Sequence, residues 1–171
     1  MAPILDEHML EFVSLSPEQT QRLGARLGAL LQGGDVICLE GPLGAGKTCL
    51  AQGMGRGCGI VETLISPTFV FARQYSRPGA SQTLYHVDWY RISDAEMVFS
   101  LGVDEFMGDP HAIFIIEWAE RARSLIPSDH LWIRLDFATH ADQMRRMLYF
   151  TAQGDRHTAL LQMFRRSAFG A

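Results

Sequence analysis

Two uninterrupted apolar runs stand out along the chain, VICL at residues 36–39 and AIFII at residues 112–116. Short runs without polar interruption are typical of strands buried on both faces of a sheet. Before the first run, leucines recur at helical spacing over residues 17–31. Ser16 followed by Pro17 is a frequent helix start, because serine caps the first turn and proline needs no partner for an N–H there. The N-terminal part therefore predicts a helix followed by a buried strand.

The rest of the chain continues this alternation of strands and helices. Pro78-Gly79 predicts a turn, so the segments on either side of it can pair as an antiparallel hairpin. We expect strands at residues 11–13, 36–39, 69–75, 83–87, 112–116, 131–137 and 147–151, and helices at residues 17–31, 47–57, 94–101, 118–125 and 156–166. No repeat or long linker interrupts the pattern, so a single domain over residues 1–171 is predicted.

Directly after the first apolar run, residues 41–48 read GPLGAGKT and fit the phosphate-loop motif G-x-x-x-x-G-K-[ST]. Glycines allow the backbone to curl until several N–H groups converge on phosphate oxygens, and the N-terminus of the following helix faces the same anion. By this motif, Lys47 reaches the β- and γ-phosphates and the Thr48 hydroxyl ligates Mg²⁺. The order of strand, loop and helix that the motif requires is present.

The loop also predicts a fold class and a ligand. We expect an α/β fold, a P-loop NTPase-like three-layer sandwich with a mixed, mainly parallel sheet. ATP or ADP with Mg²⁺ is the expected ligand, because Lys47 is the only lysine and the guanine-specifying motif N-K-x-D is therefore excluded. Nucleotide contacts are predicted for Gly41, Leu43, Gly44, Ala45, Gly46, Lys47, Thr48 and Cys49.

Two carboxylates follow predicted strands near this loop in the fold. Glu117 follows the run at residues 112–116, which is the layout of a Walker B strand, and Asp88 closes the strand before it. Mg²⁺ prefers oxygen ligands, so both acids are candidates for holding the metal together with Thr48. Lys47, Asp88 and Glu117 are the candidate catalytic residues. Residue types alone leave open which acid holds the metal and which orients the attacking water.

Composition narrows the class of protein. The net charge of −4 lacks the basic excess of a self-sufficient nucleic-acid binder. Three cysteines without C-x-x-C spacing argue against a disulfide framework and favour a reducing cytoplasm, and the N-terminus resembles neither a signal peptide nor a membrane span. The six histidines are scattered, which predicts structural or surface roles. For Cys49, at a helix N-terminus, a lowered thiol pKa is one interpretation and packing is the preferred one.

An ordered set of further motifs resembles the TsaE (YjeE) family, the small ATPases of bacterial tRNA threonylcarbamoyladenosine synthesis. The resemblance covers nearly the whole chain. Besides LEGPLGAGKT, it is carried by SPTF at residues 66–69, HVDWYR at 86–91, Leu101-Gly102 with Glu105, and IEWAER at 116–121.

The resemblance implies several site residues. Thr68 would lie in a switch-like loop near the γ-phosphate, and Trp118 would lie beside the site. Thr20 and one of Arg145 and Arg146 would frame the nucleotide base. This chain carries the polar segment 139–143 where the family more often has a glycine before the arginine.

The resemblance also implies partners: the TsaB–TsaD heterodimer, with tRNA contacted indirectly through that complex and no membrane. Hydrolysis of ATP would reset the complex between turnovers. Two alternatives stay open from the residues alone. One is a small-molecule P-loop kinase, with Arg121 and Arg123 as possible lid residues that are more simply surface charges. The other is a nucleotide-gated interaction module with little turnover.

Overall fold

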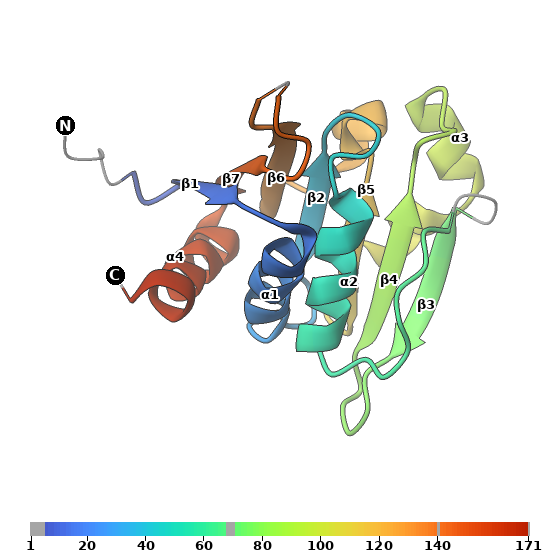
Figure 1. Ribbon diagram of the computed structural model, residues 1–171. Helices are drawn as coiled ribbons and strands as arrows, with labels where there is room; N and C mark the ends of the chain where they lie inside the picture. The colour runs from blue at the N-terminus through green and yellow to red at the C-terminus, as the bar shows by residue number, and fades with distance from the viewer. Residues whose placement is uncertain (1–5, 68–70, 140, 171) are drawn as a thin grey trace.

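A mixed seven-stranded sheet forms the centre of the computed structural model, which describes residues 6–67, 71–139 and 141–170 (Figure 1). The strand order within these residues is β1-β7-β6-β2-β5-β4-β3. The strands are β1 (Met9–Ser14), β2 (Val36–Glu40), β3 (Ala72–Ser76), β4 (Thr83–Asp88), β5 (Ala112–Glu117), β6 (His130–Phe137) and β7 (Arg146–Gln153). The helices are α1 (Pro17–Gly28), α2 (Lys47–Gly57), α3 (Ala95–Ser100) and α4 (Asp155–Phe169), and the 3₁₀ segments are η1 (Val103–Phe106) and η2 (Ala119–Leu125).

The pairing of the strands confirms the predicted mixed sheet. The four central strands β6, β2, β5 and β4 run parallel to one another. Antiparallel strands flank them on both sides, with β7 and β1 beside β6 and with β3 beside β4. The β3–β4 pair is the hairpin predicted around Pro78-Gly79.

Helical layers cover the central part of the sheet on both faces. In Figure 1, α1, α2 and α4 lie in front of the sheet, and α3 lies on the opposite side. The strand β2 shows why its sequence has no polar alternation: Ile37 and Leu39 pack in the core under α1, α2 and α4, whereas Val36 and Cys38 pack in the second core with residues of α3 and η2. This arrangement confirms the three-layer prediction.

Two predicted helices differ from the structure. The helix predicted over residues 17–31 ends at Gly28, and Leu30 and Leu31 continue it only with hydrogen bonds to residues three positions earlier. The segment at residues 118–125 is not an α-helix but a pair of 3₁₀ turns broken at Ala122, which has non-helical backbone angles. It is short and has no side-chain N-cap, and such segments often remain 3₁₀.

The parallel pairing positions the candidate site. The carboxyl ends of neighbouring parallel strands meet at one edge of a sheet, and β6, β2, β5 and β4 all end there. The register places Glu117 opposite Leu39 of β2 on one side and opposite Asp88 of β4 on the other. The glycine loop after β2 and both candidate acids are therefore brought to the same edge.

A seam of four glycines holds α2 against α1. A methyl carbon added at Gly28 would lie 2.1 Å from the carbonyl oxygen of Met54, and one added at Gly53 would lie 2.2 Å from the carbonyl oxygen of Gln21. The corresponding distances at Gly24 and Gly57 are 2.5 and 2.0 Å, again to carbonyl oxygens of the facing helix. The obstacle is main chain in each case, so a larger residue would have to move a helix.

We expect Gly53→Ala to destabilise the fold by about 2–3 kcal/mol, the usual effect of overpacking a core. The midpoint of thermal unfolding should fall by roughly 5–10 °C. Helix propensity alone predicts the opposite change in stability, because it favours alanine over glycine by about 1 kcal/mol. Gly108→Ala is the matched control, because the added methyl group would meet nothing within 4 Å. If the two variants had the same midpoint of thermal unfolding, the two helices would not be closely packed at these glycines.

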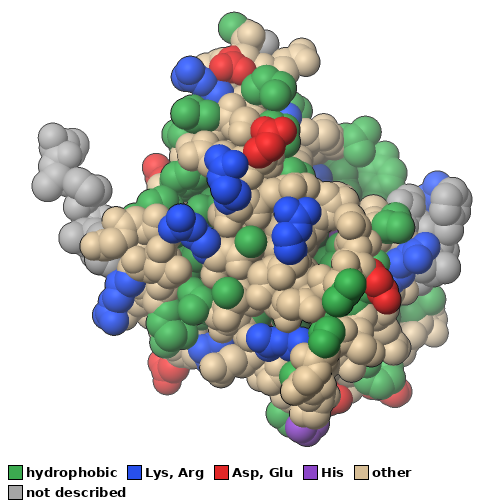
Figure 2. All heavy atoms as spheres, turned by 60° about the horizontal axis from the view of Figure 1, so that its bottom comes forward, with side chains coloured by type: hydrophobic (Ala, Val, Ile, Leu, Met, Phe, Trp, Pro, Cys, Tyr) green, Lys and Arg blue, Asp and Glu red, His purple; other side chains and the backbone are tan. Residues whose placement is uncertain are grey.

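The surface agrees with the modest charge of the sequence. On the face shown in Figure 2, the basic side chains are separated from one another by other residues and form no continuous basic patch. None of the helices in the described ranges combines the length and the apolar character needed to cross a lipid bilayer.

Candidate functional site

The glycine loop at residues 41–48 has backbone angles that side chains disfavour. Gly41 lies at φ +151°, and a methyl carbon on it would come within 2.3 Å of the Leu135 carbonyl oxygen. Gly46 lies at φ +102° and immediately precedes α2. Glycine is thus required by close approach at the first position and by the left-handed backbone at the second. Together they let the loop wrap around the N-terminus of α2, an end that attracts anions.

Lys47 is the first residue of α2, and only 5% of its surface is exposed. Its ammonium group donates hydrogen bonds to the carbonyl oxygens of Gly41 and Pro42, at 2.6 and 3.0 Å, and lies 3.9 Å from the centre of the Trp118 ring. Burial lowers the pKa of the ammonium, while the negative charges of Glu117, Glu120 and Asp88 oppose this shift. A cation is therefore held inside the loop, beside two candidate acids.

Glu117 lies at the end of β5 with 3% of its surface exposed. The Thr48 hydroxyl donates toward both of its carboxylate oxygens, at 2.9 Å to Oε1 and 3.0 Å to Oε2. Nε2 of His86 lies 2.8 Å from Oε1. The structure therefore brings Thr48 and Glu117, two of the three predicted metal ligands, into direct contact.

Asp88 lies at the end of β4 and is 5% exposed. The Ser66 hydroxyl donates to its Oδ2 at 2.6 Å, and the main-chain N–H of Tyr90 donates to its Oδ1 at 2.8 Å. Both carboxylate oxygens thus have a donor, and the side chain is fixed next to Glu117.

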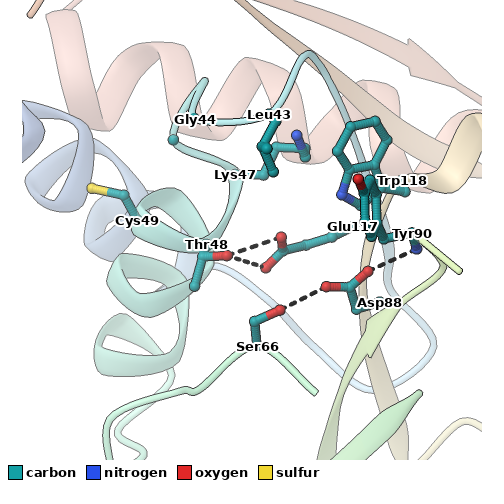
Figure 3. Close-up of a pocket in the computed structure, with 11 residues that line it drawn as sticks. Leu43, Gly44, Lys47, Thr48, Cys49, Ser66, Asp88, Tyr90, Glu117 and Trp118 are labelled. Carbon is teal, nitrogen blue, oxygen red and sulfur yellow. Dashed lines mark hydrogen bonds between the residues drawn. The ribbon is translucent and has the colours of Figure 1, made fainter. Parts of the chain in front are cut away.

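These residues line one cavity of about 330 Å³ at the carboxyl edge of the sheet. Figure 3 shows Glu117 pointing toward Thr48 at the start of α2 and Asp88 beside it pointing toward Ser66, with Trp118 and Tyr90 along the opposite side. The lining residues are Leu43, Gly44, Gly46, Lys47, Thr48, Cys49, Ser66, Asp88, Tyr90, Glu117 and Trp118.

Trp118 adopts a left-handed backbone, with φ +59° and ψ +37°, directly after Glu117. This conformation is uncommon for a bulky side chain and is often found where function requires a particular placement. Here it turns the chain so that the indole ring stacks against Lys47 and contacts the Tyr90 ring, with ring centres 4.9 Å apart. The aromatic wall of the cavity depends on this turn.

The donor groups suit a particular chemistry. Two carboxylates and a hydroxyl are hard oxygen donors, which Mg²⁺ prefers over sulfur and imidazole ligands. No group of three His, Cys, Asp or Glu side chains in the described residues could hold a metal without further help. A divalent cation at this edge would therefore need ligands from the Thr48 hydroxyl and from a bound phosphate as well.

Thr20 and Arg145, which the family resemblance places beside the nucleotide base, do not line this cavity. Thr20 is buried, and its hydroxyl bonds with Ser14 and Ser16. Arg145 is more than half exposed and forms an ion pair with Asp142 at 3.0 Å. Neither belongs to the cavity lining found among the described residues, so their contact with a base stays a prediction. Thr68 lies outside the described residues.

Arg146 is the better placed of the two arginines. Its guanidinium donates to the carbonyl oxygen of Ala45 at 3.0 Å and to that of Gly44 at 3.1 Å. It also lies over the Phe137 ring, at 4.4 Å. Arg146 is therefore the arginine of the two that contacts the loop, and which of them contacts a base stays a prediction.

Cys49 lines the cavity, and its thiol donates a hydrogen bond to the Pro17 carbonyl oxygen at 3.3 Å. Burial raises the pKa of this thiol, the negative charge of Glu18 adds to the shift, and Arg146 opposes it. The interpretation of a thiol pKa lowered by the helix N-terminus is therefore wrong. Packing, the preferred interpretation, agrees with the raised pKa.

Sequence reasoning missed Ser66 and His86 as site residues. His86 was grouped with scattered structural histidines, although it lies two positions before Asp88. On a strand, residues two apart point to the same face, so this spacing places His86 below Asp88 on the side that faces α2. Ser66 belongs to a motif that the sequence analysis quoted, but only the fold reveals its contact with Asp88.

The arginines considered for a kinase lid lie apart from the loop. Arg123 forms an ion pair with Glu40 at 3.6 Å and stacks on Trp132, on a different groove of the surface. Arg121 is exposed and does not line the cavity, although its guanidinium lies 5.6 Å from the Trp118 ring centre and 5.7 Å from that of Tyr90. Both have the surface placement that was the simpler interpretation.

Comparison with known proteins gives a consistent family likeness. A model of the family described as Threonylcarbamoyl adenosine biosynthesis protein TsaE matches residues 14–147. A tRNA threonylcarbamoyladenosine biosynthesis protein TsaE of Streptomyces coelicolor is 38% identical over 139 residues, which is 80% of this chain and 92% of that protein. The protein of the same name from Bacillus subtilis is 33% identical over 157 residues, covering 92% and 94% of the two chains.

A solved structure shares the fold. The crystal structure of Bacillus subtilis YdiB superposes with a TM-score of 0.76 at 30% sequence identity, covering 92% of this chain and 95% of that one. The family match over residues 14–147 includes the glycine loop and both candidate acids.

Proposed function

Because the chain belongs to the TsaE family of tRNA threonylcarbamoyladenosine biosynthesis proteins, we propose that it is the magnesium-dependent ATPase of that pathway. The observation that carries the proposal is the convergence of Lys47, Thr48, Asp88 and Glu117 on one cavity at the carboxyl edge of the sheet. A buried cation, a helix N-terminus and hard oxygen donors in one place are the parts that phosphoryl-transfer sites share.

The chain's own groups would divide the work as follows. The amides of the loop and of the first turn of α2 would hold the phosphates, and the Lys47 ammonium would neutralise charge on the β- and γ-phosphates. Thr48 and Glu117 would hold Mg²⁺, which when bound supplies positive charge next to the transferred phosphoryl group. Asp88, beside them, would accept a hydrogen bond from the attacking water and orient it in line with the bond that breaks.

The proposed role in the pathway is to reset a TsaB–TsaD complex between turnovers, rather than to transfer the carbamoyl group. The charge of this chain supports an indirect contact with tRNA. With a net charge of −4 and no continuous basic patch on the face shown in Figure 2, the chain offers little to hold an RNA backbone by itself.

The test measures phosphate release from ATP by the purified chain, alone and then with a bacterial TsaB–TsaD pair and unmodified tRNA. We expect hydrolysis to depend strongly on the pair, and modified tRNA to form only when both ATP and this chain are present. Hydrolysis that ignores the pair, with no modification of tRNA, would remove the pathway role and leave an ATPase. Transfer of phosphate to a small metabolite would indicate a kinase, and nucleotide binding without turnover would indicate a gated interaction module.

A further inference from the structure

His86 is completely buried on β4, at the inner side of the candidate metal site. Its Nε2 lies 2.8 Å from Oε1 of Glu117, and both side chains are within 3% of full burial. A buried carboxylate is costly unless its oxygens are hydrogen-bonded. His86 is therefore part of the environment that keeps Glu117 in place.

The proton on the His86 ring can be assigned from its neighbours. An ionised carboxylate only accepts hydrogen bonds, so Nε2 carries a proton and donates it to Glu117. The other ring nitrogen, Nδ1, is buried and has no hydrogen-bond partner within the part of the chain that the structure describes. A buried N–H without an acceptor is costly, so the geometry places the N–H of the ring at Nε2 rather than at Nδ1. His86 thus presents one fixed donor, aimed at Oε1.

The two oxygens of Glu117 are consequently not equivalent. Among the residues that the structure describes, Oε1 is contacted by His86 and Thr48, whereas Oε2 is contacted by Thr48 alone, at 3.0 Å. Thr48 is itself a candidate metal ligand, so its hydroxyl would reorient on metal binding. The contact from His86 comes from the buried side and does not depend on that hydroxyl.

We propose that His86 is a positioning residue for Glu117: it engages Oε1 and leaves Oε2 directed toward the metal and the γ-phosphate. This inference rests on the proposed function, because it assigns a purpose to the orientation of Glu117. Partners of this kind, which hold a metal ligand from behind, typically contribute about 10- to 100-fold to metal affinity or activity.

Three variants separate positioning from simple packing. His86→Gln keeps a side-chain N–H₂ at nearly the distance of Nε2 and can still reach Oε1. His86→Asn is polar but too short, and His86→Leu fills the space without a donor. We expect His86→Asn and His86→Leu to raise the Mg²⁺ concentration for half-maximal nucleotide binding about tenfold, and we expect His86→Gln to keep it within about threefold of that of the unchanged protein.

The measurement is binding of a fluorescent ATP analogue, titrated with Mg²⁺ and repeated in EDTA, with circular dichroism to confirm folding. Binding in EDTA should be unchanged in all three variants, because the loop and Lys47 are intact. His157→Gln is the matched control: His157 is also buried and bonded to a carboxylate, Asp129, through its Nδ1 at 2.5 Å, but it lies on α4 away from the loop. Its Mg²⁺ dependence should not change.

The outcomes distinguish the two proposals. If the unchanged protein binds the nucleotide equally well with and without Mg²⁺, the proposed magnesium-dependent function fails before His86 is considered. If Mg²⁺ dependence is present but is the same in His86→Asn and in the unchanged protein, the positioning role is wrong. A His86→Gln variant that is folded and as impaired as His86→Asn would also overturn it, since the donor would then have no effect.

Discussion

Replacement of Lys47 by alanine is expected to lower the rate of ATP hydrolysis by about a thousandfold, the effect of removing a preorganised positive group from a site where negative charge develops. No other lysine exists to substitute for it. Arg146, which contacts the loop from β7, is engaged with the carbonyl oxygens of Gly44 and Ala45. The loop would therefore have no ammonium group to place against the phosphates.

Lys47→Arg makes this test more specific. Guanidinium is wide and planar, whereas the ammonium of Lys47 fits between two carbonyl oxygens and the Trp118 ring. We expect the arginine variant to be nearly as inactive as the alanine variant, although its charge is the same. The measurement is single-turnover phosphate release, with thermal unfolding to confirm the fold. Unchanged hydrolysis by pure Lys47→Ala protein would refute the assignment of the loop.

Glu117→Gln and Asp88→Asn are expected to fail in different ways. Glu117 contacts the Thr48 hydroxyl directly, so its loss should raise the Mg²⁺ concentration needed for half-maximal activity about tenfold or more. Asp88 is held by Ser66 and by the Tyr90 amide, and we assign it to the water. Asp88→Asn should lower turnover at saturating Mg²⁺ by about 100-fold, the usual contribution of a positioned base.

Separate measurement of metal dependence and of turnover decides between the acids, because a metal ligand affects the first and a base chiefly the second. Val61→Ala is a suitable control: its side chain is 88% exposed and does not line this cavity. The assignment is reversed if Asp88→Asn shifts the Mg²⁺ dependence and Glu117→Gln changes turnover alone.

The parts of the fold that sequence predicted well are those in which local pattern and long-range packing require the same residues. The run at 36–39 must be apolar at every position because β2 has a core on each face. The glycine loop was found because its backbone admits few residues other than glycine at Gly41 and Gly46. Glu117 was found because it ends a fully buried strand, β5.

The parts that sequence could not predict depend on register and on tertiary contact. The pairing of β4 with β5 brings His86 to Glu117. The local sequence HVD at residues 86–88 does not indicate which strand pairs with β4. The helix predicted over residues 118–125 is another example, because Trp118 at its start has a left-handed backbone and Ala122 within it has non-helical backbone angles. Thr20 is a buried polar residue whose hydroxyl forms hydrogen bonds within the protein, to Ser14 and Ser16.

The glycine seam joins α1 and α2 into one cooperative unit of local unfolding. With main chain against main chain, neither helix can bend away without separating the pair along its length. Elements that open together share one opening free energy, so the amide hydrogens of both helices would exchange with solvent at a common limiting rate. A ligand bound at the loop would stabilise the start of α2 at Lys47, and amide exchange in α1 would then slow as well. Exchange in α1 would therefore report whether the loop is occupied.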